Sequence, residues 1–299
     1  MTFDRRVHLY LEKSLRESAA AGKHNFINLV VKVLKNAGFD VVFAPFPKQE
    51  PPPDQRSLSH MAHPPNAHGL VFRRVYFYPF WRIERVAQRW HWDVAKAEFD
   101  PRMEAPDVAR FYRFWQQRLF GTSPRTARRE GFIYVPLQGH LDMHRGFQSC
   151  SPFEMLDHCL AHSGGRRIVA TLHPKETYTR SDMKRLDHLA RQHAQLTITM
   201  GPPAQYLETC DFVVTQNSGV GFSGYFFAKP VLLFAEIDFH HIAVKADIKD
   251  LDTSFGRVLG SEPPFATYVW WFLQRQSINA GREEAEARIK DRFRRFGWI

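Results

Sequence analysis

The segment 211–239, which reads DFVVTQNSGVGFSGYFFAKPVLLFAEIDF, constrains the fold more than any other part of this chain. Its first apolar run ends in a polar turn at 216–219, Gln-Asn-Ser-Gly, and a glycine-spaced apolar stretch at 220–228 precedes a second apolar run. Short apolar runs bounded by turn residues are typical of strands that are buried on both faces of a sheet. The order strand, turn, helix, strand therefore predicts an α/β unit. Its polar turn is expected at the edge of a parallel sheet, where nucleotide-using α/β proteins commonly hold phosphate.

The same alternation continues on both sides of this segment. Strands are predicted at 132–136, 167–172, 196–200, 212–215 and 231–235, with helices between them at 152–162, 181–193, 203–209 and 219–228, and two final helices at 265–278 and 282–296. Repeated strand–helix order predicts a parallel sheet with helices on both of its faces.

The N-terminal part begins with a shorter unit of the same kind. Strands predicted at 7–11 and 40–44 flank a helix whose apolar residues share one face: Phe26, Leu29, Val30, Val33 and Leu34. Its length suits a strand–helix–strand crossover. Residues 12–24 are small and polar and are expected to form a loop.

The next three stretches are less regular. Residues 45–68 are rich in proline and are expected to form an extended loop. Residues 69–78 have a β-rich pattern, and 81–120 have a helical composition. The polar, basic stretch 121–131 is the predicted linker between two domains.

A chain of 299 residues is long enough for two domains, and the linker predicts a boundary between 1–128 and 129–299. The net charge of +10 favours an acidic partner, either nucleic acid, anionic lipid or a phosphorylated substrate, although charge can also serve solubility alone. No pure block of basic residues is present, so a disordered nucleic-acid-binding tail is not indicated. Since the sequence also lacks an aromatic-rich RNA-binding signature, no nucleic-acid partner is expected.

Several classes of protein are disfavoured by the composition. No apolar run reaches about 18 residues and the N-terminus lacks an apolar signal-peptide core, so we expect a cytoplasmic protein without a spanning helix. The three cysteines show no C-x-x-C spacing, which argues against both structural disulfides and a zinc ribbon. The absence of G-x-S-x-G disfavours an α/β-hydrolase.

The segment Leu172-His173-Pro174-Lys175-Glu176 follows the strand predicted at 167–172. Proline cannot donate to the ladder, so the chain is expected to turn there and to leave His173 at the carboxyl edge of the sheet. An imidazole at this edge can donate to a phosphate oxygen, while Lys175 adds positive charge and Glu176 an acceptor. The alternative is a surface turn with a capping histidine.

The turn Asn217-Ser218-Gly219 is a stronger signal, because a strand precedes it and a helix follows it. It is neither a P-loop nor a full G-x-G-x-x-G motif, and glycines can also serve tight packing of a helix on its strand. We predict phosphate binding at this turn. The strands that lead to His173 and Ser218 are expected to be neighbours, so both residues should contact the same phosphate.

A third strand end is Val135-Pro136-Leu137-Gln138-Gly139-His140-Leu141-Asp142. A carboxylate at Asp142 could take a proton from an attacking hydroxyl. The alternative is an aspartate that bonds loop backbone ahead of the helix at 152–162.

Two histidine groups resemble metal ligands in type. They are Asp238-Phe239-His240-His241 and the trio His60, His63 and His68. Neither has a full ligand set at a defined spacing, so no metal is predicted.

Taken together, residues 131–245 resemble the bacterial capsule polysaccharide biosynthesis and export family, whose best-known members are Kdo transferases. The matching segments are VPLQ…D (135–142), LHPKE (172–176), DFVVTQNSGVGF (211–222) and AKPVLLF (228–234). The family tends to carry an aromatic pair and a glycine-rich turn after its last strand, where this chain has Asp238-Phe239-His240-His241.

The resemblance implies a GT-B fold, in which two Rossmann-like parallel-sheet domains face each other across a cleft, the N-terminal one being small or incomplete. It implies a metal-independent glycosyltransferase with no cofactor, which takes a CMP-linked nucleotide-sugar as donor. The donor-binding residues would be Gln138, His173, Pro174, Lys175, Asn217, Ser218 and Gly219. The catalytic candidates are Asp142 as base and Glu176. The C-terminal domain would bind the donor, and the N-terminal domain the polysaccharide or glycolipid acceptor.

Two other functions remain open at this stage. One is a nucleotide-sugar epimerase or hydrolase on the same fold, and the other is a non-catalytic basic protein that binds a polysaccharide or nucleic acid. Capsule-type acceptors are commonly lipid-linked, so the resemblance also implies peripheral contact with the inner face of the cytoplasmic membrane. The basic helix at 282–296, with Ile289, Phe293 and Phe296 on one side, is either the membrane contact or a helix packed on the protein.

Overall fold

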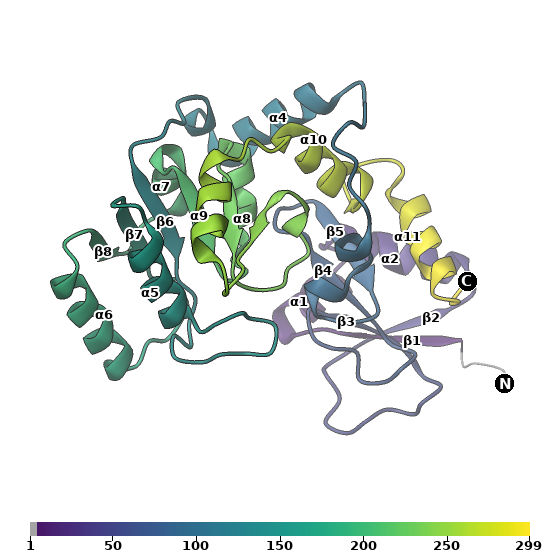
Figure 1. Ribbon diagram of the computed structural model, residues 1–299. Helices are drawn as coiled ribbons and strands as arrows, with labels where there is room; N and C mark the ends of the chain where they lie inside the picture. Colours follow the sequence, from purple (N-terminus) through teal and green to yellow (C-terminus); the bar gives the residue numbers. More distant parts are fainter. Residues whose placement is uncertain (1–4) are drawn as a thin grey trace. The chain divides into compact units, whose positions relative to one another are not determined.

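The computed structural model describes residues 5–299, and the chain forms two compact units (Figure 1). The first unit combines the residues up to Ala97 with Trp271–Ile299, and the second comprises Glu98–Trp270. The chain therefore leaves the first unit once and returns to it at the end, whereas the sequence suggested a single boundary near 128.

The second unit is built on a parallel sheet of six strands in the order β11-β10-β9-β6-β7-β8. Its strands are β6 (Phe132–Pro136), β7 (Arg167–Thr171), β8 (Leu196–Thr199), β9 (Phe212–Thr215), β10 (Val231–Leu233) and β11 (Val244–Lys245). Its helices are α4 (Val108–Phe120), α5 (Pro152–His162), α6 (Arg180–Gln192), α7 (Pro203–Thr209), α8 (Gly219–Gly224), α9 (Leu251–Gly260) and α10 (Phe265–Trp270), with short 3-10 turns η2 (Ser123–Arg125), η3 (Tyr225–Phe227) and η4 (His240–Ile242).

Helices cover both faces of this sheet because the strands bury apolar residues on both sides. Ile133 and Val135 of β6 lie in one core with residues of α5 and α9. The residue between them, Tyr134, faces the other way and its ring lies 5.1 Å from that of Tyr206 in α7. The predicted strands and helices of this region agree with the structure to within one or two residues at most ends, and α9 was not predicted.

The first unit contains a mixed sheet of six strands in the order β12-β5-β4-β3-β1-β2. Its elements are β1 (Arg6–Tyr10), α1 (Lys13–Ala20), α2 (Asn25–Asn36), β2 (Asp40–Ala44), β3 (Arg56–His60), β4 (Leu70–Arg74), β5 (Phe80–Glu84), η1 (Arg89–His91), α3 (Asp93–Lys96), the π-turn η5 (Trp271–Arg275), β12 (Ile278–Asn279) and α11 (Ala285–Arg295). Strands β1 to β4 are parallel, while β5 and β12 run antiparallel to their neighbours.

Three predictions for this unit were wrong. The expected loop at 12–24 contains α1, and the expected loop at 45–68 contains β3, a strand between β1 and β4. Strand β3 reads RSLSH, and its two serines are fully buried, so the sequence lacks the apolar signal of a central strand. The stretch 81–120, expected to be helical, opens within β5 before it reaches α3 and α4.

The end of the chain completes the first unit. Strand β12 pairs with β5, and α11 contributes Ile289 and Phe293 to a core that also contains Phe26 and Val30 of α2. All four side chains are nearly or fully buried. The N-terminal part of the sequence is thus incomplete without 271–299, since it lacks both this edge strand and this helix.

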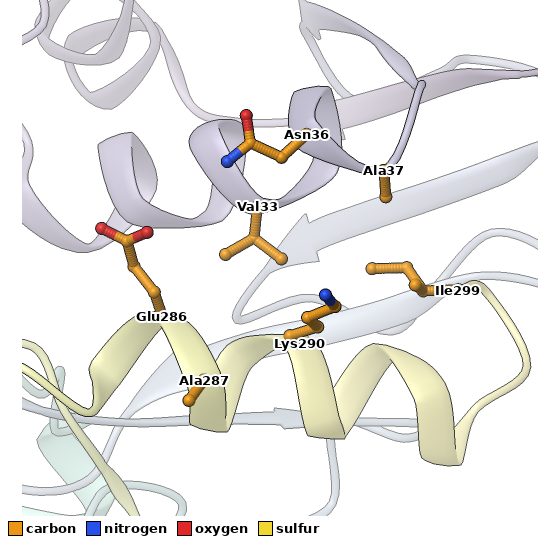
Figure 2. A pocket seen from close by; sticks show the side chains of 7 residues that line it. All are labelled: Val33, Asn36, Ala37, Glu286, Ala287, Lys290 and Ile299. Carbon is orange, nitrogen blue, oxygen red and sulfur yellow. The ribbon is translucent and has the colours of Figure 1, made fainter.

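A small cavity of about 260 Å³ remains between α2 and α11 (Figure 2). It is lined by Val33, Asn36, Ala37, Glu286, Ala287, Lys290 and Ile299. None of the predicted donor-binding or catalytic residues lines it, because all of those lie in the second unit.

Segment 98–128 belongs to the second unit because α4 packs against α10 and its Tyr112 ring stacks on Phe226 of η3. The Tyr112 hydroxyl donates to the Tyr225 carbonyl, and the Gln116 amide donates to the Phe226 carbonyl over 2.6 Å. The predicted class, an α/β protein with two Rossmann-like sheet domains, is confirmed. In the part of the chain that the structure describes, no helix is long and apolar enough to cross a membrane.

Candidate functional site

The three polar segments singled out in the sequence follow three adjacent strands of the second unit. Strand β6 lies between β9 and β7, so the turn at 216–219 and the His-Pro turn flank the loop that contains Gln138. All three strands are parallel, and their carboxyl ends therefore lie at one edge of the sheet. This is the edge at which open α/β sheets bind ligands.

The strands that precede His173 and Ser218 were predicted to be neighbours, and this prediction was wrong. Strand β6 separates β7 from β9, and two strand spacings amount to about 10 Å. The two residues therefore flank the loop after β6 from opposite sides.

The turn after β9 is held mainly by its own hydrogen bonds. The Ser218 N–H donates to Thr215 Oγ1 over 3.3 Å, and the Val220 N–H donates to Ser218 Oγ over 3.2 Å. Ser218 thus caps α8, whose six residues make it a short helix. Since its oxygen accepts from Val220, the Ser218 hydroxyl hydrogen remains available for another acceptor.

Asn217 connects this turn to the loops on both sides. Its backbone N–H lies 3.4 Å from Gln138 Oε1 in the loop after β6. Its side-chain Nδ2 lies 3.4 Å from the carbonyl of Glu236 in the loop after β10. Both hydrogen bonds are long and therefore weak, so they orient the turn without holding it rigidly.

His173 fills one of the two roles that the sequence left open, the capping of its turn. Its Nδ1 accepts from the Lys175 N–H over 3.2 Å and so caps the turn, while its own N–H donates to the Tyr178 hydroxyl over 2.8 Å. A neutral imidazole that accepts at Nδ1 carries its proton on Nε2. The side chain is exposed, so the Nε2–H can donate to a ligand.

The neighbouring residues of the His-Pro turn, Pro174, Lys175 and Glu176, are exposed. The Glu176 carboxylate lies so close to Gly139 that a side chain at position 139 would overlap it. The structure thereby brings Glu176, from the loop after β7, against the loop after β6.

Asp142 is exposed and paired with an arginine. Arg185 of α6 donates to Asp142 Oδ1 over 2.9 Å and to Asp157 Oδ2 over 3.3 Å. The Arg185 guanidinium also lies over the Phe153 ring, 4.1 Å from its centre. The alternative raised by the sequence was an aspartate bonded to loop backbone; the structure instead pairs Asp142 with an arginine of α6.

Sequence reasoning missed Arg185 and His140. Arg185 is one of several basic residues on α6, and nothing in its spacing marks it as the partner of Asp142. His140 is exposed and has a left-handed backbone with φ of +58°. A left-handed non-glycine residue directly after Gly139 signals a constrained loop, but only the structure reveals it.

The histidine groups considered as metal ligands serve other contacts. His240 and His241 stack with ring centres 4.3 Å apart, His240 Nδ1 lies 2.8 Å from the Ile237 carbonyl, and His241 Nδ1 lies 2.9 Å from the Tyr268 hydroxyl. His60 Nδ1 lies 3.1 Å from Glu12 Oε2. Among residues 5–299, no group of three or more histidine, cysteine or acidic side chains could hold a metal ion.

Comparison with protein families identifies residues 98–243 with the family described as capsule polysaccharide biosynthesis protein. The match begins at the first residue of the second unit and contains every predicted site residue. The resemblance noted in the sequence is therefore confirmed. None of the curated proteins compared with the chain matches it.

Two solved structures from Thermosulfurimonas dismutans share the fold. The KpsC β-Kdo 2,7-transferase aligns with a TM-score of 0.52 at 14% identity, over 96% of this chain and 99% of its own. The KpsC β-Kdo 2,4-transferase aligns with a TM-score of 0.52 at 11% identity, over 88% of this chain and 89% of its own. The chain has the GT-B-type architecture of these transferases.

Proposed function

We propose that this chain is a glycosyltransferase of surface polysaccharide synthesis. The proposal starts from the match of residues 98–243 to the capsule polysaccharide biosynthesis family. The chain transfers a sugar from a nucleotide-activated donor, CMP-linked, to a glycan or glycolipid acceptor. The observation that carries the proposal is the meeting of the loops after β9, β6 and β7 at one sheet edge.

The donor binds at this edge. The Nε2–H of His173, the Lys175 ammonium and the Ser218 hydroxyl can each donate to the phosphate or ribose. Gln138, Asn217 and Gly219 shape the turn between them, and Pro174 holds the His-Pro turn. Positive charge and hydrogen-bond donors at this position offset the charge that develops on the leaving phosphate, so the proposed reaction needs no metal or other cofactor.

Two carboxylates are candidates for the base. Asp142 would accept a proton from the acceptor hydroxyl after release from Arg185, and Glu176 would do so from its place against Gly139. A base must come within hydrogen-bond reach of the hydroxyl, and hydrogen bonds seen without substrate often rearrange when it binds. Asp142 and Glu176 are therefore both candidates for the catalytic base.

The acceptor binds the N-terminal part of the chain, residues 1–128. Lipid-linked acceptors would bring the protein to the inner face of the cytoplasmic membrane. The net charge of +10 supports a peripheral contact with anionic lipid.

A thermal-shift screen with CMP, UDP, GDP and dTDP, followed by turnover with the corresponding nucleotide-sugars, tests the proposal. Ligand at 100 times its dissociation constant should stabilise the protein by about 2.7 kcal/mol. Turnover that requires an acceptor supports a transferase. Donor consumption without acceptor would instead indicate an epimerase or hydrolase, and the lack of stabilisation by any nucleotide would overturn the donor site.

A further inference from the structure

Helix α4 (Val108–Phe120) presents a face that the proposed donor site does not use. Residues 110, 113, 114, 117 and 118 recur at the spacing of one helical face, and all five are exposed. They are Arg110, Arg113, Phe114, Gln117 and Arg118. Phe114 is 54% exposed and is among the most exposed large apolar side chains of the described residues.

The opposite face of α4 holds the helix in place. Phe111 and Trp115 are buried, and the side chains of Tyr112 and Gln116 donate to backbone carbonyls of η3. The exposed face is therefore presented by an anchored helix, and its side chains do not take part in the core.

The charge of this face is unopposed. Helix α4 contains three arginines and no acidic residue. None of these arginines forms an ion pair with any of residues 5–299, and Arg118 lies over the Trp115 ring at 5.8 Å. Other arginines of the chain are paired, such as Arg185 with Asp142 and Asp157, and Arg166 with Asp211.

Helix α11, the element for which the sequence suggested membrane contact, differs in both respects. Its apolar residues Ile289 and Phe293 are fully buried in the core of the first unit. Arg292 and Arg295 pair with Asp93, and Arg294 pairs with Asp291. The apolar stripe thus packs on the protein, and three of the five basic residues of α11 have acidic partners.

We propose that the exposed face of α4 docks on an anionic lipid surface. An exposed helix face with one aromatic side chain among unpaired arginines suits a plane of lipid headgroups, since the ring can enter the interface while the arginines contact phosphates. Single-stranded nucleic acid is usually bound in a basic groove by several aromatic side chains on which successive bases stack. The exposed face of α4 has only one aromatic side chain, Phe114. The inference extends the proposed function, because it assigns the membrane contact to particular residues.

Sedimentation with vesicles of neutral lipid, with and without about one third anionic lipid, tests the assignment. The wild-type chain should bind only the anionic vesicles, and salt should weaken the binding. Because each basic residue near an anionic surface contributes about 1 kcal/mol, the triple variant R110Q/R113Q/R118Q should bind roughly 100-fold more weakly. The variant Phe114→Ser, which changes no charge, should also weaken vesicle binding but leave binding to soluble dextran sulfate unchanged.

The matched control is K290Q/R294Q/R295Q, which removes the same charge from α11. Loss of vesicle binding in this variant as large as in the α4 triple variant would overturn the assignment to α4. Equal loss of vesicle and dextran sulfate binding in Phe114→Ser would also overturn it, since a soluble polyanion would then be the better ligand. Thermal melting verifies that each variant is folded. Turnover of the wild-type chain with a soluble acceptor, measured without vesicles, tests the proposed transferase separately.

Discussion

The carboxylate of Glu176 lies directly against the backbone of Gly139, so the loop after β7 and the loop after β6 meet at a position that has no room for a side chain. The overlapping atoms belong to the end of a flexible side chain, and an alanine at position 139 would displace Glu176 without breaking the fold. Gly139 is therefore a sensitive probe of the role of Glu176.

The variant Gly139→Ala should lower turnover to the same extent as Glu176→Ala if Glu176 acts in catalysis from its observed position. In the Glu176→Ala background, Gly139→Ala should cause little further loss, because no carboxylate remains to be displaced. Turnover of the two single variants and the double variant measures this coupling. Additive losses would show that the two residues act independently.

His173→Ala should weaken CMP binding by about 1.5–3 kcal/mol, the range for a hydrogen bond to a charged group. The control is His173→Asn, whose side-chain oxygen can replace Nδ1 as the acceptor of the Lys175 N–H but cannot replace the Nε2 donor. Calorimetry should show weak binding by both variants. If the asparagine variant binds CMP as wild type does, His173 shapes the turn and does not contact the nucleotide.

Asp142→Asn should leave donor affinity unchanged and reduce turnover by about a hundredfold or more if Asp142 is the base. Arg185→Gln removes the partner of Asp142 and is the companion variant. Since the ion pair is exposed, its loss should cost at most about 1 kcal/mol of stability. Near-normal turnover in Asp142→Asn would leave the pair a structural contact and would move the role of base to Glu176.

The stability of the second unit should depend on the protonation of His240. Burial is the main factor that lowers the pKa of this imidazole, followed by Lys245, while the Ile237 carbonyl, Asp238 and Glu236 act in the opposite direction. The folded state therefore binds the proton less readily than the unfolded state. Stability is fully present above pH of about 6.5 and is lost as the pH falls toward the lowered pKa, with a limiting slope of about 1.4 kcal/mol per pH unit.

Urea unfolding at pH 7.5 and pH 5.5 measures this effect. The variant His240→Asn should show a smaller loss of stability between the two pH values than the wild type. His188→Asn, which changes an exposed histidine of α6, is the control and should behave like the wild type. An unchanged pH dependence in His240→Asn would contradict the prediction.

Phe293→Ala should destabilise the first unit by about 3–5 kcal/mol, because the ring is fully buried between α11 and the sheet. The ring stacks on Trp298 at 5.2 Å, so tryptophan fluorescence during urea unfolding can follow the change. Arg294→Ala, an exposed neighbour on α11, should alter stability by less than about 0.5 kcal/mol. Equal effects of the two variants would argue against the role of α11 in the core.

The sequence by itself determined the parallel sheet of the second unit and the three polar strand ends. Strands β6 and β9 and helices α5 and α7 begin and end as predicted, because apolar runs and turn residues set them locally. The segments 135–142, 172–176, 211–222 and 228–234 also carry the resemblance to the capsule polysaccharide biosynthesis family, whose model matches residues 98–243. These signals all come from residues that are close together along the chain.

Only the tertiary structure decided the strand order and the partners of the site residues. The insertion of β6 between β7 and β9, the pairing of Asp142 with Arg185, and the approach of Glu176 to Gly139 join residues that lie far apart in the sequence. The same holds for β12 and α11, which complete a sheet and a core formed by the opposite end of the chain. Local patterns specify which face of an element is apolar, but the partner that covers that face is selected by packing over the whole chain.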